Sequence, residues 1–510
     1  MIYIAKTESG LVRGLTAGDT FITVFKGIPF AAPASGKNRW RVPQPVEKWD
    51  GIKDCFEFGP AAYQTVKTGE GFYDKEWHNN PEWVMSEDCL QLNIWTPAKD
   101  PGEKLPVMVW IYGGGLQEGY PGEMEFDGER IAKRGIVLVS VNYRVNVFGW
   151  LAHPEITAEC GGKDCTNFGL YDQKAGIEWV YRNIAAFGGD PENITIFGQS
   201  AGGRSVMSQV VSPKNNDGHI KRAISQSSTP LNFGFGHGND YPTLPEAEEM
   251  GKKFFEFIGA KNLEEARSMP AEFIRDKGAE FSAKRMGSWQ FTVDGSFLPG
   301  EPVALLNEGK YIDIPMMCGS TTGEFFDLIN AKDMAGLEKT ARSLYGEYAD
   351  EFLKIIEFDK NDFERSMALC KVNGSAFSAR LFAMRSADLG RTTYLYQFDP
   401  EIPGDDHPGV FHSSDLWFVF ETLGKCWRPF KGKHYDLARL VCNYWTNFAK
   451  TGDPNGKDAD GKAMPVWIPF TDDSSHLMVF EDTAHMGDEK DMSPSVREMY
   501  RLAADKMWRK

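Results

Sequence analysis

Gly198-Gln199-Ser200-Ala201-Gly202 lies between the β-branched and aromatic run Asn193–Phe197, which predicts a buried strand, and Arg204–Val210, which can be written as a helix. A G-x-S-x-G sequence in this setting forms a sharp turn that lifts the serine hydroxyl above the edge of the sheet. The turn needs glycine because it leaves little room for a Cβ atom. The motif also arises by chance in a chain with 52 glycines, so its meaning depends on a base, an acid and oxyanion donors elsewhere.

Candidate oxyanion donors come earlier in the chain. The apolar run Pro106–Tyr112 predicts a strand, and Gly113-Gly114-Gly115 follows it directly. Consecutive glycines can present backbone N–H groups with no side chain in the way, which an oxyanion requires. Triple glycine is also common in flexible loops, but its place after a strand that precedes the G-x-S-x-G motif favours the oxyanion role.

The base must be a histidine that follows the acid in the chain. Two of the nine histidines, His407 and His412, follow the predicted strand that ends at Phe398. Spacing alone does not separate them. We favour His412, because the apolar helix start Leu416–Phe420 would hold it by packing, whereas His407 lies in an acidic turn.

The acid is predicted to be Glu324, which ends an apolar strand beginning near Ile314 and precedes Phe325-Phe326. A carboxylate between such walls is partly buried and needs a hydrogen-bonded partner, for which an imidazole is suited. Asp327 is the local alternative.

The order of elements predicts an α/β fold. Apolar strands alternate with helices through the first half of the chain, which is the pattern of a large, mostly parallel sheet with helices on both faces. We expect an antiparallel meander in residues 1–60, an irregular surface loop in 61–88, and helical insertions at about 240–285 and 333–390 that form a lid. Residues 1–510 are interpreted as a single domain.

Composition excludes several classes of function. The 510 residues are 42% hydrophobic and carry a net charge of −16, which disfavours nucleic acid and anionic membrane surfaces as partners. No apolar run is long enough to span a membrane. The N-terminus reads as a strand rather than a secretory signal, so we expect a cytoplasmic protein, a secreted form with its signal removed being the alternative.

The eight cysteines give no zinc pattern. Cys160 and Cys165 are close enough for a loop disulfide, and the others are expected to be buried thiols. Neither a metal nor an organic cofactor is expected, and the oligomeric state is left open.

The chain resembles the type-B carboxylesterases, the family of bacterial para-nitrobenzyl esterases, animal carboxylesterases, fungal lipases and cholinesterases. The resemblance runs nearly end to end. The stretches that carry it, ahead of the G-x-S-x-G motif, are Phe25–Ala31, Ser86–Trp95, Trp110–Gly115, Asn142–Arg144, Gly169–Gln173 and Phe187–Pro191.

The resemblance implies an α/β-hydrolase fold and a role for each candidate. Ser200 would be the nucleophile, Glu324 the acid and His412 the base. It assigns the oxyanion N–H groups to Gly114, Gly115 and Ala201, and places Ser227 near the acid. It also implies structural ion pairs between Arg39 and Glu87 and between Arg144 and Asp172.

Three departures from the family are visible. Gln199 replaces the usual glutamate before the nucleophile, from which we expect a changed substrate preference or pH response. Cys89 matches the family's first disulfide cysteine but lacks its partner, which agrees with a reducing compartment. The choline-binding tryptophan of cholinesterases aligns with Asn79, two residues from Trp77, which argues against acetylcholine as substrate.

The predicted function is therefore hydrolysis of small to medium apolar carboxylic esters through an acyl-enzyme, with no metal and no cofactor. Nearby aromatic residues suggest an apolar pocket, although for at least half of them core packing is the favoured interpretation: Phe325, Phe326, Trp417, Phe418, Phe420, Trp289 and Phe291. An acyltransferase, or an amide or lactone hydrolase, would use the same triad. A non-catalytic cholinesterase-like binding protein is disfavoured because every catalytic position is filled.

Overall fold

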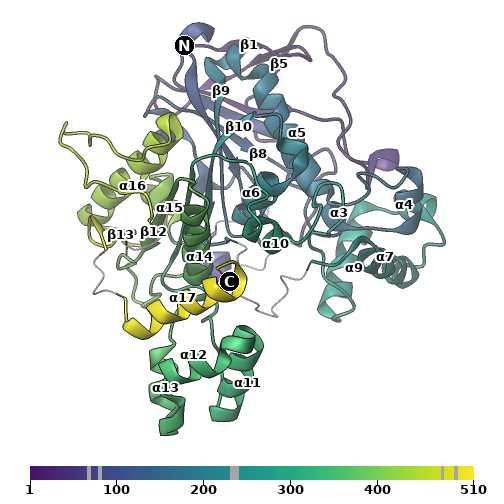
Figure 1. Cartoon of the computed structure of the whole chain (residues 1–510). Helices are drawn as coiled ribbons and strands as arrows, with labels where there is room; N and C mark the ends of the chain where they lie inside the picture. The colour runs from purple at the N-terminus through teal and green to yellow at the C-terminus, as the bar shows by residue number, and fades with distance from the viewer. Residues whose placement is uncertain (66–70, 78–82, 230–240, 472–475, 488–491, 510) are drawn as a thin grey trace.

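A large mixed sheet of eleven strands forms the centre of the molecule (Figure 1). The computed structural model describes residues 1–65, 71–77, 83–229, 241–471, 476–487 and 492–509. The strand order is β14-β13-β12-β11-β10-β9-β7-β8-β6-β4-β3. In chain order these strands are β3 (Leu15–Thr16), β4 (Thr23–Pro29), β6 (Gln91–Thr96), β7 (Leu105–Ile111), β8 (Val137–Val141), β9 (Gly189–Gln199), β10 (Ile220–Gln226), β11 (Met316–Thr321), β12 (Thr393–Phe398), β13 (Met478–Phe480) and β14 (Ala484–Met486).

The middle of this sheet is parallel and its two margins are antiparallel. β8, β7, β9, β10, β11, β12 and β13 pair in parallel. β6, β4 and β3 at one margin and β14 at the other pair antiparallel. Every residue of β8 and of β11 is buried, as expected for strands covered on both faces.

Helices cover both faces of the sheet. The helices α5 (Phe168–Asn183), α6 (Ala201–Val211) and α14 (Gly374–Asp388) pack against strands of one face, whereas α2 (Glu129–Ala132) and α16 (Gly432–Thr451) contact each other on the opposite face. The shorter helices α1 (Phe72–Glu76), α3 (Asn146–Trp150), α4 (Pro154–Glu159), α10 (Pro302–Asn307) and α15 (Leu416–Val419) lie in the connections.

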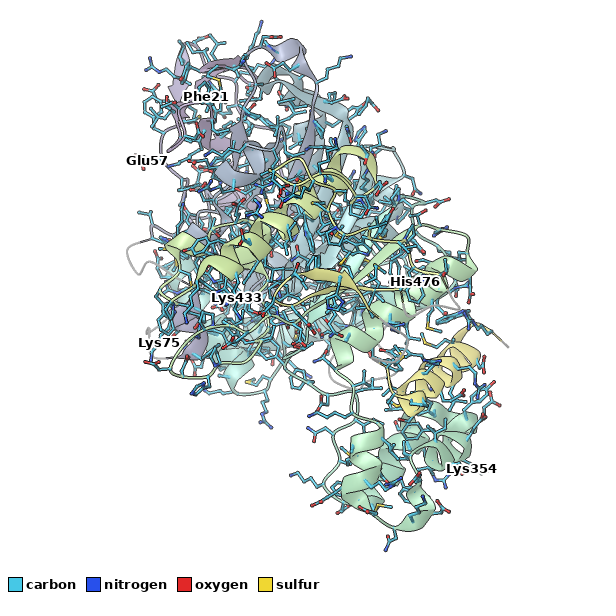
Figure 2. The ribbon with its side chains drawn as sticks, turned by 90° about the vertical axis from the view of Figure 1, so that its left-hand side faces the viewer. Phe21, Glu57, Lys75, Lys354, Lys433 and His476 are labelled. Atoms are coloured by element: carbon cyan, nitrogen blue, oxygen red, sulfur yellow. The ribbon has the colours of Figure 1, made fainter. Side chains whose placement is uncertain are left out.

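The two helical insertions form where they are predicted. The first contains α7 (Leu244–Ile258), α8 (Leu263–Ser268) and α9 (Ala271–Ala283), and it lies beside α3 and α4. The second begins with α11 (Met334–Tyr345), α12 (Ala349–Ile355) and α13 (Phe363–Leu369), which project from the body beside the C-terminal helix α17 (Pro494–Met507). In Figure 2, Lys354 of α12 lies at the end of the molecule opposite Phe21.

The expected N-terminal meander is only partly correct. β1 (Ile4–Lys6), β2 (Leu11–Arg13) and β5 (Ile52–Asp54) form a separate three-stranded sheet in which β2 and β5 are parallel. β3 and β4 join the large sheet instead. Gly14 lies between β2 and β3, where the chain passes from one sheet to the other, and a Cβ there would lie 2.6 Å from the carbonyl oxygen of Val24 in β4.

None of the described helices has the length and apolar composition needed to cross a membrane.

Candidate active site

Ser200 occupies the tight turn between β9 and α6. Its backbone angles are φ 56° and ψ −127°, a strained conformation for a residue with a side chain, and its N–H donates to the carbonyl of Gln226 at 2.9 Å. A Cβ at position 198 would lie 2.5 Å from the carbonyl oxygen of Gly202, and one at position 202 would collide with the carbonyl oxygen of Ile111. The two glycines of the motif are therefore required by close packing of the turn.

His412 and Glu324 form a buried pair in the same region. The Nδ1–H of His412 donates to Oε2 of Glu324, whose side chain is 2% exposed. The other carboxylate oxygen accepts a hydrogen bond of 2.9 Å from the hydroxyl of Thr321, the last residue of β11. Because Nδ1 carries the proton, Nε2 of His412 is left as a base. The structure thus brings His412, and not His407 or Asp327, into the predicted pairing.

Gln199 reaches the other nitrogen of the same imidazole. Its Nε2 lies 3.3 Å from Nε2 of His412, and both side chains are buried. With Nδ1 protonated, Nε2 of His412 can only accept, so the Gln199 amide donates to it. The amide N–H and a serine hydroxyl would therefore compete for the same lone pair on Nε2 of His412. A carboxylate at position 199 could not donate to this nitrogen unless it carried a proton.

A third buried carboxyl, Asp415, lies beside this pair and was not recognised in the sequence. Its Oδ2 accepts from the amide of Gln226 at 2.8 Å and from the hydroxyl of Tyr396 at 3.3 Å. Burial raises the pKa of Asp415 to about 6, and the nearby charge of Glu324 adds to that rise. Only its spacing of three residues after His412, on the same turn, could have indicated it.

The glycine loop lies next to the serine. A Cβ on Gly113 would be 2.7 Å from the carbonyl oxygen of Gln199 and 3.1 Å from Cβ of Ser200. Gly114 has a φ of 101° and Gly115 a φ of 63°. Among the described residues, neither of their N–H groups donates to a protein acceptor. Ala201 is the first residue of α6, where the N–H groups of a helix have no partner within the helix.

These residues surround a cavity of about 480 Å³. Its wall includes Ser200, His412, Gln199 and the three glycines. The remaining described lining residues are Tyr73, Trp77, Tyr112, Gln117, Glu118, Gly119, Glu123, Phe126, Phe325, Ser413 and Leu416. None of the described lining residues comes from 240–285 or 333–390, so the two insertions do not form this wall. The segment predicted as an irregular surface loop supplies Tyr73 and Trp77 instead.

The predicted aromatic pocket is only partly present. Phe325 lines the cavity, with its ring 4.5 Å from that of His412. Phe326 is 66% exposed and lies outside the described lining. Trp417 is buried beneath Trp77, whose ring stacks on it at 6.2 Å.

The other aromatic candidates are core residues. Phe418 packs against Phe398 and Phe430, and Phe420 packs against Trp110, Phe126 and Phe197. Trp289 and Phe291 are buried among aromatic residues of the first insertion and its neighbours. All four are fully or almost fully buried, because the short helix α15 and the chain after α9 face inward.

The ion pairs implied by the resemblance are formed. Arg39 binds Glu87 through two hydrogen bonds of 2.6 Å, and Arg144 binds Asp172 at 2.7 and 2.8 Å. Both arginines are buried and away from the cavity lining. Ser227 is buried with a φ of 53°, but within the described chain its hydroxyl has no hydrogen-bond partner. Within the described chain, Thr321 supplies the hydroxyl that donates to the acid.

All eight cysteines are free thiols, including Cys89, so the loop disulfide between Cys160 and Cys165 is not formed. Burial raises the pKa of Cys89 above its usual range. Asn79, used in the argument about choline, lies outside the described residues. Trp77, two residues away, lines the cavity. In the described part of the chain, no group of three or more histidine, cysteine or acidic side chains could hold a metal ion.

A parallel sheet with a strained serine after one central strand, and an acid and a histidine after two later ones, defines the α/β-hydrolase class. The carboxylesterase family model matches residues 3–499. Mouse cholinesterase is 32% identical over 507 residues, covering 91% of this chain and 81% of that protein. Carboxylesterase EST55 of Geobacillus stearothermophilus is 30% identical, with a TM-score of 0.76 over 98% of this chain and 99% of that one. A PNB esterase is 26% identical, with a TM-score of 0.76 over 98% and 100%.

The chain belongs to the carboxylesterase family. It is a carboxylic-ester hydrolase, and the Ser-Glu-His triad typical of that family has its counterparts here in the three residues described above.

Proposed function

We propose that this enzyme cleaves small to medium apolar esters through an acyl-enzyme formed on Ser200. The observation that carries the proposal is the buried pair of Glu324 and His412, whose imidazole lines the same cavity as Ser200. A buried carboxylate on Nδ1 fixes the tautomer in which Nε2 is the base.

In the proposed mechanism, His412 removes the proton of Ser200 as the hydroxyl attacks the ester carbonyl. Glu324 then stabilises the imidazolium. Backbone N–H groups of Gly114, Gly115 and Ala201 receive the oxyanion, and each such donor typically contributes about 3–4 kcal/mol to the barrier reduction. His412 returns the proton to the leaving alcohol, and water repeats the two steps to release the acid.

The cavity supports an apolar substrate of limited size. Tyr73, Trp77, Phe126, Phe325 and Leu416 provide aromatic and aliphatic wall, and about 480 Å³ accommodates a small molecule. We propose that the acyl or the alcohol group contacts the rings of Phe325 and Trp77.

The experiment compares wild type and Ser200→Ala on para-nitrophenyl acetate, butyrate and octanoate. We expect a burst of para-nitrophenol in wild type and a loss of at least about 10⁴-fold in kcat/KM in the variant. An intact thermal transition would show that the variant is folded. Unchanged turnover in Ser200→Ala would contradict the proposal.

Further substrates distinguish ester hydrolysis from the alternative activities. Anilide and lactone analogues test amide and lactone hydrolysis, and addition of an alcohol acceptor tests acyl transfer. A choline ester, compared with its neutral isostere, tests the alcohol side, since Trp77 is in the cavity despite its offset from the family position. We expect the neutral ester to be preferred.

A further inference from the structure

A second cavity lies behind the catalytic acid. It has a volume of about 530 Å³ and is bounded by the ends of β11, β12 and β13, by the start of α14 and by α17. Of the described residues, none lines both this cavity and the one over Ser200. The two cavities are connected through side chains: Thr321 lines the second cavity and donates a hydrogen bond to Glu324, whose partner His412 lines the first.

Arg380 of α14 lines this cavity and is the unusual residue in it. The residue is only 7% exposed. Its guanidinium lies between the rings of Phe470 and Tyr500, at 5.6 and 5.4 Å. No carboxylate or carbonyl group within the described ranges forms an ion pair or a hydrogen bond with it. The polar groups that act on its charge are the Tyr500 hydroxyl and the like charge of Arg497.

The other deeply buried arginines are treated differently. Arg39, Arg144 and Arg428 are 3–4% exposed, and each binds a carboxylate through two hydrogen bonds. A buried cation without an anion is costly, because the rings of Phe470 and Tyr500 replace only part of its hydration. Burial accordingly lowers the pKa of Arg380. Arg380 therefore differs from the three other buried arginines in having no carboxylate partner among the described residues.

The other residues of the cavity wall indicate what kind of ligand would supply a carboxylate to Arg380. Lys371 adds a second cation. The first N–H groups of α14 add none, because those of Ser375 and Ala376 already donate to the side chain of Asn373. Asp327 is the one acidic residue among the described lining, so the described part of the wall carries a net positive charge. Seven of the remaining described lining residues are aliphatic: Ala368, Val372, Ala376, Leu395, Leu477, Val479 and Val496.

We propose that this cavity is a binding site for a small monocarboxylate with an apolar body, whose carboxylate pairs with Arg380. A monoanion balances the two cations and Asp327, and the aliphatic wall receives the hydrocarbon part. Inorganic phosphate would leave that wall unused and would bring two charges close to Asp327. The site is independent of the chemistry proposed for Ser200, so either can fail alone.

The experiment titrates sodium octanoate, octanamide and inorganic phosphate into the full-length protein by calorimetry. Wild type is compared with Arg380→Met, which keeps the length and removes the charge. The control is Arg385→Met on the same helix, where the arginine donates to the carbonyl of Asn307 and packs near Trp508. Because octanoate can also enter the cavity over Ser200, the informative quantity is the part of the binding that depends on Arg380.

We expect a site for octanoate in wild type and in Arg385→Met whose Kd rises at least about tenfold in Arg380→Met. Octanamide is expected to bind weakly and equally to all three proteins. Thermal unfolding without ligand provides the structural control: Arg380→Met should be as stable as wild type or more stable, because an uncompensated buried charge is removed.

Three results would overturn the proposal. Octanoate could bind wild type and Arg380→Met equally, or not at all. Phosphate could bind in an Arg380-dependent manner while octanoate does not. Arg380→Met could melt well below wild type without ligand, which would mean that the protein itself already compensates the charge.

Discussion

The two cavities on either side of Glu324 differ in how their buried charges are satisfied. In the cavity over Ser200, the Glu324 carboxylate is paired with His412 and hydrogen-bonded by Thr321. In the cavity behind it, Arg380 is also buried but, within the described chain, is paired with no carboxylate. A charge fixed by partners positions a reacting group, whereas a charge left without one creates affinity for a ligand. Both cavities open at the carboxyl ends of parallel strands, where such sites are common in α/β folds.

The largest effect is expected from removing the base in the satisfied cavity. His412→Asn should lower kcat/KM for para-nitrophenyl esters by about 10⁴-fold or more, because serine then has no proton acceptor. His407→Asn is the matched control, since His407 lies on an exposed turn in the same connection, after β12. Steady-state kinetics of the two variants measure both losses. Equal losses, or a larger loss in His407→Asn, would contradict the assignment of His412 as the base.

An intermediate effect is expected from Asp415, which shares the buried region with the pair. Its carboxyl has a folded-state pKa of about 6, above the usual value of 3.8, so folding favours its protonated form. Its contribution to stability is therefore present below about pH 4 and is lost as pH rises to about 6. Asp415→Asn keeps the acceptor oxygen for Gln226 and Tyr396 but cannot ionise. We expect the variant to gain about 2–3 kcal/mol over wild type between pH 4 and pH 8.

Urea unfolding of both proteins at several pH values measures this difference. Parallel stability profiles for wild type and Asp415→Asn would show that the carboxyl is not held in its protonated form, and that charge in this cavity is satisfied by other means.

The smallest effect is expected from Gln199, which contacts Nε2 of His412. In Gln199→Glu a carboxylate would face the imidazole and favour the imidazolium over the neutral base. The acid limb of the pH profile of kcat/KM should then move up by about one unit, with a change of only a few-fold at the plateau. Gln199→Met, which is uncharged, should leave the limb where it is. If the acid limb shifted in both variants, or in neither, the charge at position 199 would not determine the pH response.

The residues of the proposed triad could be predicted from sequence because each one follows a local rule. A strand, a tight glycine turn and a helix identify Ser200, and the required order of acid and histidine leaves few candidates for Glu324 and His412. The central strands could be predicted for the same reason, since continuous apolar runs such as Val137–Val141 have one common structural meaning.

The parts that could not be predicted depend on contacts between distant segments. Tyr73 and Trp77 lie in a polar, irregular stretch, and only the folded chain places them over Ser200. Phe418 was expected in the pocket because it follows His412 closely, but the short helix turns its ring toward Phe398 in the core. Arg380 lies in an ordinary helical pattern, and only the packing shows that no carboxylate of the described chain pairs with it.

The most direct test of the central claim is to identify the residue that carries the acyl group. Wild-type enzyme is mixed with para-nitrophenyl butyrate, quenched in acid within the burst, digested and analysed by mass spectrometry. The account predicts one butyryl group on the peptide that contains Ser200, and none in Ser200→Ala. Butyryl on another residue, or a burst with no modified peptide at Ser200, would contradict it.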